Sequence, residues 1–180
     1  MIGLERGTVR LCDHETEWEN EAAHTISRLR GILGRVICGI EHVGSTSVKS
    51  IKAKPIIDIA LAVERFEDIL AFESELLEAG YYYRPDNNTP TQMLFAAGNF
   101  YDGGGSLQTH FIHVVLCGSR EWKDYLNFRD YLNSHPEVAR EYEGLKTRLS
   151  ESCTRAEYTK GKAEFITGIL AAADKIKENL

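Results

Sequence analysis

The amino-acid sequence predicts an α+β fold, a mixed β-sheet flanked by helices with a helical segment at the carboxyl end. Two observations lead to this prediction. Apolar runs of strand length, with helices between them, occupy roughly residues 1–118, whereas helical spacing alone continues from about 119 to 180. The 180 residues contain no internal repeat, low-complexity tract or linker. We therefore expect a single domain, 1–180, with a core large enough to fold alone.

Apolar residues at helical spacing predict two helices in the first part of the chain. One runs from Trp18 to Leu33 and one from Phe66 to Leu77, and Gly34 and Gly80 stop them. The segment Asp102-Gly103-Gly104-Gly105 is expected to form a hairpin turn between two strands. Apolar runs predict strands over residues 36–43, 56–63, 81–84, 91–97 and 109–116.

The part of the chain beyond Gly118 is predicted to be helical throughout. Ser119 is suited to cap one helix, and Pro136 suits the first turn of the next. The spacing Thr154-x-x-Glu157 is a capping box, which predicts one last helix with apolar residues on its inner face, namely Tyr158, Phe165, Ile169 and Leu170.

Composition and charge restrict the functional classes. The formal net charge of −6 argues against a broad nucleic-acid or membrane-binding surface, but it is compatible with a local basic pocket. The first residues lack the apolar region of a secretion signal, so we expect a cytoplasmic protein. The four cysteines have no Cys-x-x-Cys spacing, and we expect all of them to be reduced: Cys12, Cys38, Cys117 and Cys153.

A small polar turn, Gly44-Ser45-Thr46-Ser47, follows the strand 36–43. Phosphate recognition needs backbone N–H groups that a ligand can approach closely and small hydroxyl groups, and this turn offers both. The alternative interpretation is an ordinary polar turn between two strands. The turn is not a Walker loop, because the Gly-Lys-Ser/Thr ending is missing.

Asp58 is an acidic residue inside the apolar strand 56–63. Burying a carboxylate costs several kcal/mol unless it has a partner, so Asp58 needs a role. A single carboxylate can hold Mg²⁺ together with phosphates and waters. Side chains alternate along a strand, so Ala60 shares its face, while Glu64 lies about 20 Å away. The alternative is a structural acid that caps a helix or pairs with Lys54.

The strand 109–116 contains two histidines, His110 and His113. Their spacing puts the two rings on opposite faces of a strand, so they cannot hold one metal ion together. His113 is flanked by apolar residues and is the better candidate for a cleft, as a metal ligand or proton carrier. A hydrogen-bonded core histidine is the alternative interpretation.

Further polar residues are candidates for the same site. Glu41 and His42 precede the Gly-Ser turn on opposite faces of their strand, so one of them would complete the site. Lys54 would attract phosphate or, like Lys49 and Lys52, be solvated. On the carboxyl-terminal helices, two pairs with the spacing of one turn would line a pocket facing the sheet: Tyr158 with Lys162, and Tyr142 with Lys146.

Several motifs in the same order resemble the GrpB family, a group of small proteins in the nucleotidyltransferase superfamily. The central ones are Glu41-His42-Val43-Gly44-Ser45-Thr46-Ser47-Val48 and Ala53-Lys54-Pro55-Ile56-Ile57-Asp58-Ile59. The strand His110-Phe111-Ile112-His113-Val114-Val115 is similar to its His-Leu-His-Val strand. Its helical signature resembles Gly118-Ser119-Arg120-Glu121-Trp122, Phe128-Arg129-Asp130-Tyr131-Leu132 and His135-Pro136-Glu137, and its last helix resembles Tyr158, Lys162, Ala163 and Phe165.

The resemblance implies a nucleotidyltransferase-like mixed sheet with flanking helices. It implies that the Gly-Ser turn meets a triphosphate, that Asp58 holds Mg²⁺, and that Arg129 is among the residues that line the pocket. Some family members are fused to dephospho-coenzyme A kinase. This chain has Val48-Lys49-Ser50-Ile51 where the family commonly has Val-Pro-Gly-Leu, and Ala60 where the superfamily carries a second acid.

The leading hypothesis is a nucleotidyltransferase-fold enzyme. It would bind a nucleoside triphosphate with Mg²⁺ and transfer the nucleotidyl group to a small acceptor. Gly44, Ser45, Thr46, Ser47 and Lys54 would contact phosphates, and Asp58 and His113 would be catalytic and hold the metal. One alternative is a nucleotide-binding or sensor module that has lost catalysis. Another is a hydrolase with a transition metal at Asp58 and the histidines.

Overall fold

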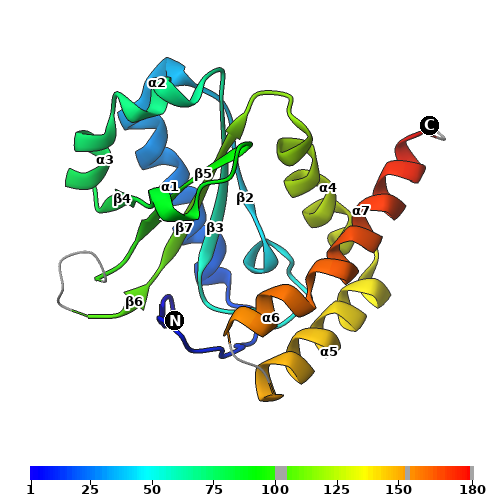
Figure 1. Cartoon of the computed structure of the whole chain (residues 1–180). Helices are drawn as coiled ribbons and strands as arrows, with labels where there is room; N and C mark the ends of the chain where they lie inside the picture. Colours follow the sequence, from blue (N-terminus) through cyan, green and yellow to red (C-terminus); the bar gives the residue numbers. More distant parts are fainter. Residues whose placement is uncertain (100–104, 153–154, 179–180) are drawn as a thin grey trace.

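A five-stranded sheet stands between two groups of helices (Figure 1). The computed structural model describes residues 1–99, 105–152 and 155–178. The order of strands is β2-β3-β7-β5-β4; β3 and β7 are parallel and the other pairs are antiparallel, so the sheet is mixed, as predicted. The strands are β2 (Ile37–Val43), β3 (Ile57–Val63), β4 (Tyr81–Tyr83), β5 (Gln92–Ala97) and β7 (His110–Leu116).

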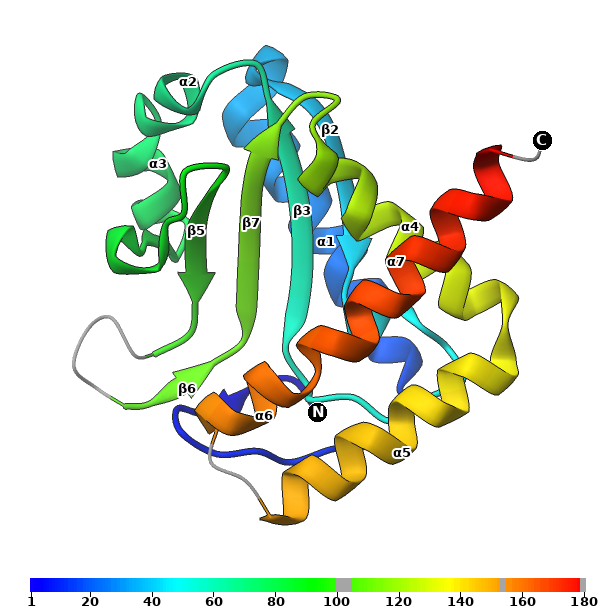
Figure 2. The same ribbon diagram turned by 45° about the vertical axis from the view of Figure 1, so that its right-hand side comes forward.

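The helices lie on opposite sides of this sheet (Figure 2). One side carries α1 (Thr16–Leu33), α2 (Phe66–Leu70) and α3 (Glu73–Glu78); the other carries α4 (Arg120–Ser134), α5 (Pro136–Ser152), α6 (Arg155–Gly161) and α7 (Ala163–Glu178). Near the amino terminus, β1 (Leu4–Glu5) pairs with β6 (Leu107–Gln108). Within the described residues, no helix combines the length and apolar character needed to cross a membrane.

The main core lies where the sheet meets α1. Ile57, Ile59 and Leu61 of β3 are fully buried there, together with Trp18 and Leu29 of α1. Because successive residues of a strand point to opposite faces, this packing turns Asp58 toward the side of α4. The apolar alternation of β3 thus positions the one acidic residue of this strand.

Most predicted elements are confirmed. Gly34 follows α1 with φ 54°, Ser119 Oγ accepts a hydrogen bond from the Trp122 backbone N–H, and Pro136 begins α5. The predicted helix 66–77 is wrong as a continuous element, because the chain leaves helical geometry at Phe72 and the Phe72 side chain packs against the main core. The predicted hairpin turn at Asp102 lies outside the described residues.

The last predicted helix is also divided. α6 ends at Gly161 and α7 begins at Ala163, with Lys162 between them. At Gly161 an added Cβ would lie 2.8 Å from Leu149 Cδ2, so a glycine lets α6 approach α5 closely. Thr154 of the predicted capping box lies outside the described residues.

The prediction of four reduced cysteines is contradicted by a disulfide between Cys38 and Cys117. The two residues are 79 positions apart in the sequence, but their Cα atoms are 6.2 Å apart. Cys38 lies on β2 and Cys117 follows β7, and both strands flank β3, so the sheet brings the two ends together. Cys12 is a free thiol, and Cys153 lies outside the described residues.

Candidate functional site

The Gly-Ser turn lies directly against Asp58. Val43, the last residue of β2, is paired with Asp58 in the antiparallel register, and Gly44 then turns the chain with φ 70° and ψ −169°. A Cβ on Gly44 would lie 2.5 Å from Asp58 Oδ2. The Ser47 hydroxyl donates to the Gly44 carbonyl oxygen at 2.6 Å and closes the turn. Only glycine satisfies both the backbone angle and the close approach.

Asp58 and His113 face each other from neighbouring strands, as predicted. His113 Nε2 lies 3.0 Å from Asp58 Oδ1, and the two side chains are 18% and 28% exposed. The other histidine of β7, His110, lies on the opposite face, where its Nε2 is 3.1 Å from Thr25 Oγ1. Burial lowers the pKa of His110. His113 is therefore the histidine of the site, and His110 is part of the core.

A chain of hydrogen bonds sets the orientation of His113. An ionised Asp58 only accepts, so His113 Nε2 is the donor and Nδ1 accepts from Gln92 Nε2 at 3.4 Å. Gln92 Oε1 accepts in turn from the Tyr125 hydroxyl at 2.6 Å. Burial raises the pKa of Tyr125, so its hydroxyl remains a donor. With both ring nitrogens engaged, His113 is placed to orient the Asp58 carboxylate.

Two cavities meet at Asp58. The larger has a volume of about 470 Å³ and reaches from Gly44 to apolar residues that include Phe128, Ile166 and Leu170. The smaller has a volume of about 270 Å³ and is lined by residues that include Thr46, Lys54 and Tyr158. Five residues line both cavities: Ser45, Asp58, His113, Thr159 and Lys162. The predicted carboxylate thus stands at the junction of one basic and one largely apolar cavity.

Two lysines surround the ring of Tyr158. The Nζ atoms of Lys54 and Lys162 lie 3.9 and 4.7 Å from its centroid. Cation–π contacts of this kind hold the ammonium groups in fixed positions at the smaller cavity. Burial lowers the pKa of Lys162, and the Asp58 carboxylate opposes this shift. The predicted Tyr158–Lys162 pair therefore lies beside Asp58, as its spacing suggested.

The two residues of the second predicted pair, Tyr142 and Lys146, differ in position: only Tyr142 lines one of the two cavities. Tyr142 lines the larger cavity, and burial raises its pKa to about 12 while hydrogen bonding with Ser45 acts in the opposite direction. Lys146 is 1% exposed and donates to the Lys52 carbonyl oxygen from a position 4.7 Å from the Tyr142 ring centroid. Burial, with the positive charge of Lys162, lowers the pKa of Lys146 to about 7.

His42 lies behind the Gly-Ser turn. Its Nε2 is 2.9 Å from Thr46 Oγ1, and Thr46 is itself 1% exposed. Burial lowers the pKa of His42 to about 4, although the Asp58 carboxylate raises it. His42 is not among the residues that line the two cavities, so it supports the turn from behind.

Glu41 and Arg129 form an ion pair beside the site. Arg129 Nη1 lies 2.9 Å from Glu41 Oε2 and donates to the His42 carbonyl oxygen at 3.1 Å. Both residues were expected among the pocket-lining candidates, yet neither is part of the lining of the two cavities. The pair instead connects α4 to β2.

The donor set fits one hard cation. Asp58 supplies a carboxylate next to lysines and hydroxyl groups that suit phosphate, and Mg²⁺ is commonly held by one or two carboxylates with phosphates and waters. The second superfamily position is Ala60, which is fully buried and paired in register with His113. The side chains of β3 therefore do not supply a second carboxylate for a metal pair.

Several residues of the site were not found from the sequence. Gln92, Tyr125 and Thr159 line the larger cavity with two acids, Glu121 and Asp124. Gln92 begins β5 on the same face as His113, because Leu94 pairs with His113 and Gln92 is two residues away. Strand alternation thus held a signal for Gln92. The residues of α4 gave no such signal, because their positions depend on how the helix packs.

Comparison with known proteins identifies the family to which this chain belongs. A family model described as "GrpB protein" matches residues 8–172. The chain belongs to the GrpB family. The resemblance inferred from the Gly-Ser turn, Asp58 and His113 is thereby confirmed.

GrpB relatives match over most of this chain. The glutamate-rich protein GrpB of Alkalihalophilus pseudofirmus is 39% identical over 173 residues, which cover 94% of this chain and 98% of the relative. A dephospho-CoA kinase of Mycolicibacterium paratuberculosis is 33% identical over 162 residues, which cover 79% of this chain and 40% of the kinase.

Solved structures support the fold of this GrpB family member. The crystal structure of the conserved protein GrpB from Enterococcus faecalis has a TM-score of 0.80 and 27% identity, and the match covers 93% of this chain and 99% of that one. The Cid1 poly(U) polymerase with bound MgGTP has a TM-score of 0.51 and 12% identity over 76% of this chain and 42% of the polymerase. The second likeness shows the nucleotidyltransferase fold alone.

Proposed function

We infer that this protein binds a nucleoside triphosphate with Mg²⁺ and transfers the nucleotidyl group to a small acceptor. The observation that carries this proposal is the position of Asp58, which is packed on Gly44 at the junction of a basic and a largely apolar cavity. The Cid1 polymerase, bound to MgGTP, shares the fold and adds a general precedent.

The smaller cavity is suited to the phosphates. Lys54 and Lys162 place two ammonium groups around Tyr158, and Ser45 and Thr46 bring small side chains and the backbone of the turn. Ammonium groups and backbone N–H groups are the common ligands of phosphate oxygens. This local cluster can attract phosphate although the net charge of the chain is −6, because charges beyond about 8 Å are largely screened at physiological salt.

The larger cavity is suited to the uncharged part of the ligands. Phe128, Ile166 and Leu170 offer apolar surface, and Tyr125 offers an aromatic ring. A base or an apolar acceptor gains about 25 cal/mol for each Å² of apolar surface that it buries there.

Asp58 would hold the Mg²⁺ ion, which supplies positive charge to the phosphates when it is bound. His113 takes part by orienting this carboxylate, since both of its ring nitrogens are engaged. In the reaction, a hydroxyl oxygen of the acceptor forms a bond to the α-phosphorus, pyrophosphate leaves, and one proton is released. The residues of the site would hold the polyphosphate in line for this exchange.

Titration calorimetry with each of the four ribonucleoside triphosphates, with and without Mg²⁺, tests the proposal. We expect Mg²⁺-dependent binding that Asp58→Asn abolishes, because an amide removes the charge that a hard cation needs. Asp130→Asn is the matched control, because Asp130 is an exposed acid of α4 that is paired with Arg129. Equal binding by the parent protein and Asp58→Asn would contradict the proposal.

The burial of Ala60 favours a second candidate, a nucleotide-binding module without turnover. Ala60 is fully buried where a second acid would stand, so a two-metal reaction lacks one ligand. Release of pyrophosphate in the presence of acceptor mixtures separates the candidates. Mg²⁺-dependent binding with no pyrophosphate under any of these conditions would leave the binding module as the function.

A further inference from the structure

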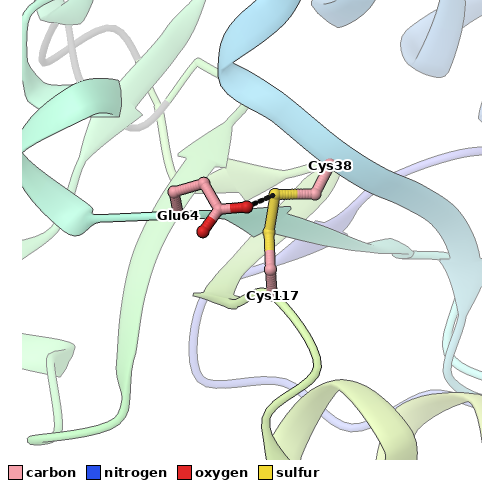
Figure 3. Close-up of side chains that lie close together, drawn as sticks. All are labelled: Cys38, Glu64 and Cys117. Carbon is pink, nitrogen blue, oxygen red and sulfur yellow. Dashed lines mark hydrogen bonds between the residues drawn. A yellow bond between two sulfur atoms is a disulfide. The ribbon is translucent and has the colours of Figure 1, made fainter.

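The Cys38–Cys117 disulfide lies far from the proposed nucleotide site. It stands beside Glu64, directly after β3 (Figure 3). Asp58 is near the other end of this strand, about 20 Å away at the usual rise per residue. Cys38 Sγ lies 3.6 Å from Glu64 Oε1, and this oxygen and the two sulfur atoms belong to one group within 4.8 Å. In this group the two sulfur atoms are bonded to each other.

The two sulfur atoms differ in their surroundings. Cys38 is exposed and Cys117 is half-buried, so a thiol from solvent reaches Cys38 more readily. Glu64 contacts Cys38, and its negative charge disfavours a thiolate there.

We propose that Cys38–Cys117 is a thiol–disulfide exchange site in which an incoming small-molecule thiol becomes attached to Cys38 while Cys117 leaves. The thiolate sulfur of the small molecule forms a bond to Cys38 Sγ, and the Cys38–Cys117 bond breaks. Cys117 departs with the electron pair and takes a proton from solvent. A second small thiol then attacks the mixed disulfide, which yields its own disulfide and a free Cys38 thiol. The net change is a two-electron reduction of the protein by two thiols.

The asymmetry follows from how exchange reactions proceed. The sulfur that is more accessible is attacked, and the sulfur that forms the more stable thiolate leaves. Both preferences select the same direction here. The Cys38 thiol, once formed, is placed to donate a hydrogen bond to Glu64.

A neighbouring contact connects α4 to β2 without the sulfur atoms. Gly39, next to Cys38, lies under Trp122 of α4, and a Cβ on Gly39 would lie 2.7 Å from the Trp122 ring. This packing holds the first turn of α4 against β2 independently of the sulfur bond. We therefore expect the fold to persist when the disulfide opens.

The test uses the full wild-type chain in its oxidised form. The protein is mixed with reduced glutathione, samples are quenched with acid at short times, free thiols are alkylated, and peptides are mapped by mass spectrometry. We expect at least fivefold more glutathione on Cys38 than on Cys117, with the alkyl label on Cys117. Cys12 is the internal reference for a thiol outside the disulfide.

The variant Glu64→Gln tests the cause of the bias. Removal of the carboxylate should reduce the preference for Cys38 at least twofold, whereas Glu67→Gln, an exposed acid of the nearby α2, should leave it unchanged. Equal modification of the two cysteines, or a preference for Cys117, would overturn the proposal. So would full alkylation of Cys38 and Cys117 in protein that no reductant has touched.

Discussion

Gly44 and Asp58 are in such close contact that a single methyl group on Gly44 would come within 2.5 Å of the Asp58 carboxylate. The contact arises because β2 and β3 are antiparallel and Val43 pairs with Asp58, so the turn after β2 folds over the acid. The phosphate-binding turn and the metal-binding carboxylate of the proposed site are therefore one structural unit. A substitution in the turn should therefore alter the position of the Asp58 carboxylate, and a substitution at Asp58 should alter the turn.

The variant Gly44→Ala tests this unit. Gly44 has φ 70° and ψ −169°, a backbone region that is essentially restricted to glycine, so an alanine there costs about 1–3 kcal/mol in backbone energy, and its Cβ also displaces Asp58. We expect a larger loss of stability in urea than for Gly80→Ala, whose φ is 88° and whose Cβ would meet nothing within 4 Å. Mg²⁺-dependent nucleotide binding should be lost in Gly44→Ala alone. Equal effects of the two variants would show that the contact with Asp58 is unimportant.

Lys54→Met tests the basic cavity. Lys54 lies 3.9 Å from the centroid of the Tyr158 ring and lines the cavity with Ser45 and Thr46. Methionine keeps the apolar stem and removes the charge, so affinity for a nucleoside triphosphate should fall about tenfold, which is about 1.4 kcal/mol. The dependence of affinity on salt should also decrease.

The matched control for this prediction is Lys49→Met. Lys49 follows the same turn, but its side chain is 74% exposed and pairs with Glu19. It should bind the nucleotide like the parent protein. A similar loss in both variants would indicate general attraction by the loop instead of a defined phosphate site.

His113→Asn separates an orienting histidine from a metal ligand. If His113 orients Asp58, the variant should bind Mg²⁺–nucleotide about tenfold more weakly, with an unchanged preference between Mg²⁺ and Zn²⁺. A ligand role would instead appear as a selective loss of Zn²⁺ binding, because imidazole suits Zn²⁺ and Mg²⁺ prefers oxygen. His110→Asn, on the opposite face of β7, should affect stability without affecting affinity.

The buried His42 predicts that stability depends on pH. Because burial lowers its pKa to about 4, the unfolded chain binds this proton more readily than the folded one. His42 contributes at most about 3 kcal/mol to the free energy of unfolding. This contribution is fully present above pH 6.5 and is lost as the pH falls toward 4. Urea denaturation between pH 4 and 7 should show a flatter profile for His42→Gln. The exposed His24→Gln is the control, and an identical slope in parent and His42→Gln would refute this account.

Local pattern was enough to predict the elements that carry the site. The apolar alternation of residues 56–63 put Asp58 on one face of its strand, and the same argument put His113 on a face opposite to His110. Both placements are confirmed, because strand geometry makes the direction of each side chain a property of its position. The Gly-Ser motif likewise indicated the turn against which Asp58 packs.

The sequence by itself thus determined the strands of the main sheet, the faces on which Asp58 and His113 lie and the membership of the family. Only the tertiary structure decided which partners meet there. Tyr125 reaches Gln92 because α4 lies across the sheet, and Cys38 bonds to Cys117 because β2 and β7 both flank β3. Such contacts join residues that are 33 and 79 positions apart. Periodicity acts over a few residues, whereas long-range contacts depend on how whole elements pack, and no local pattern encodes that.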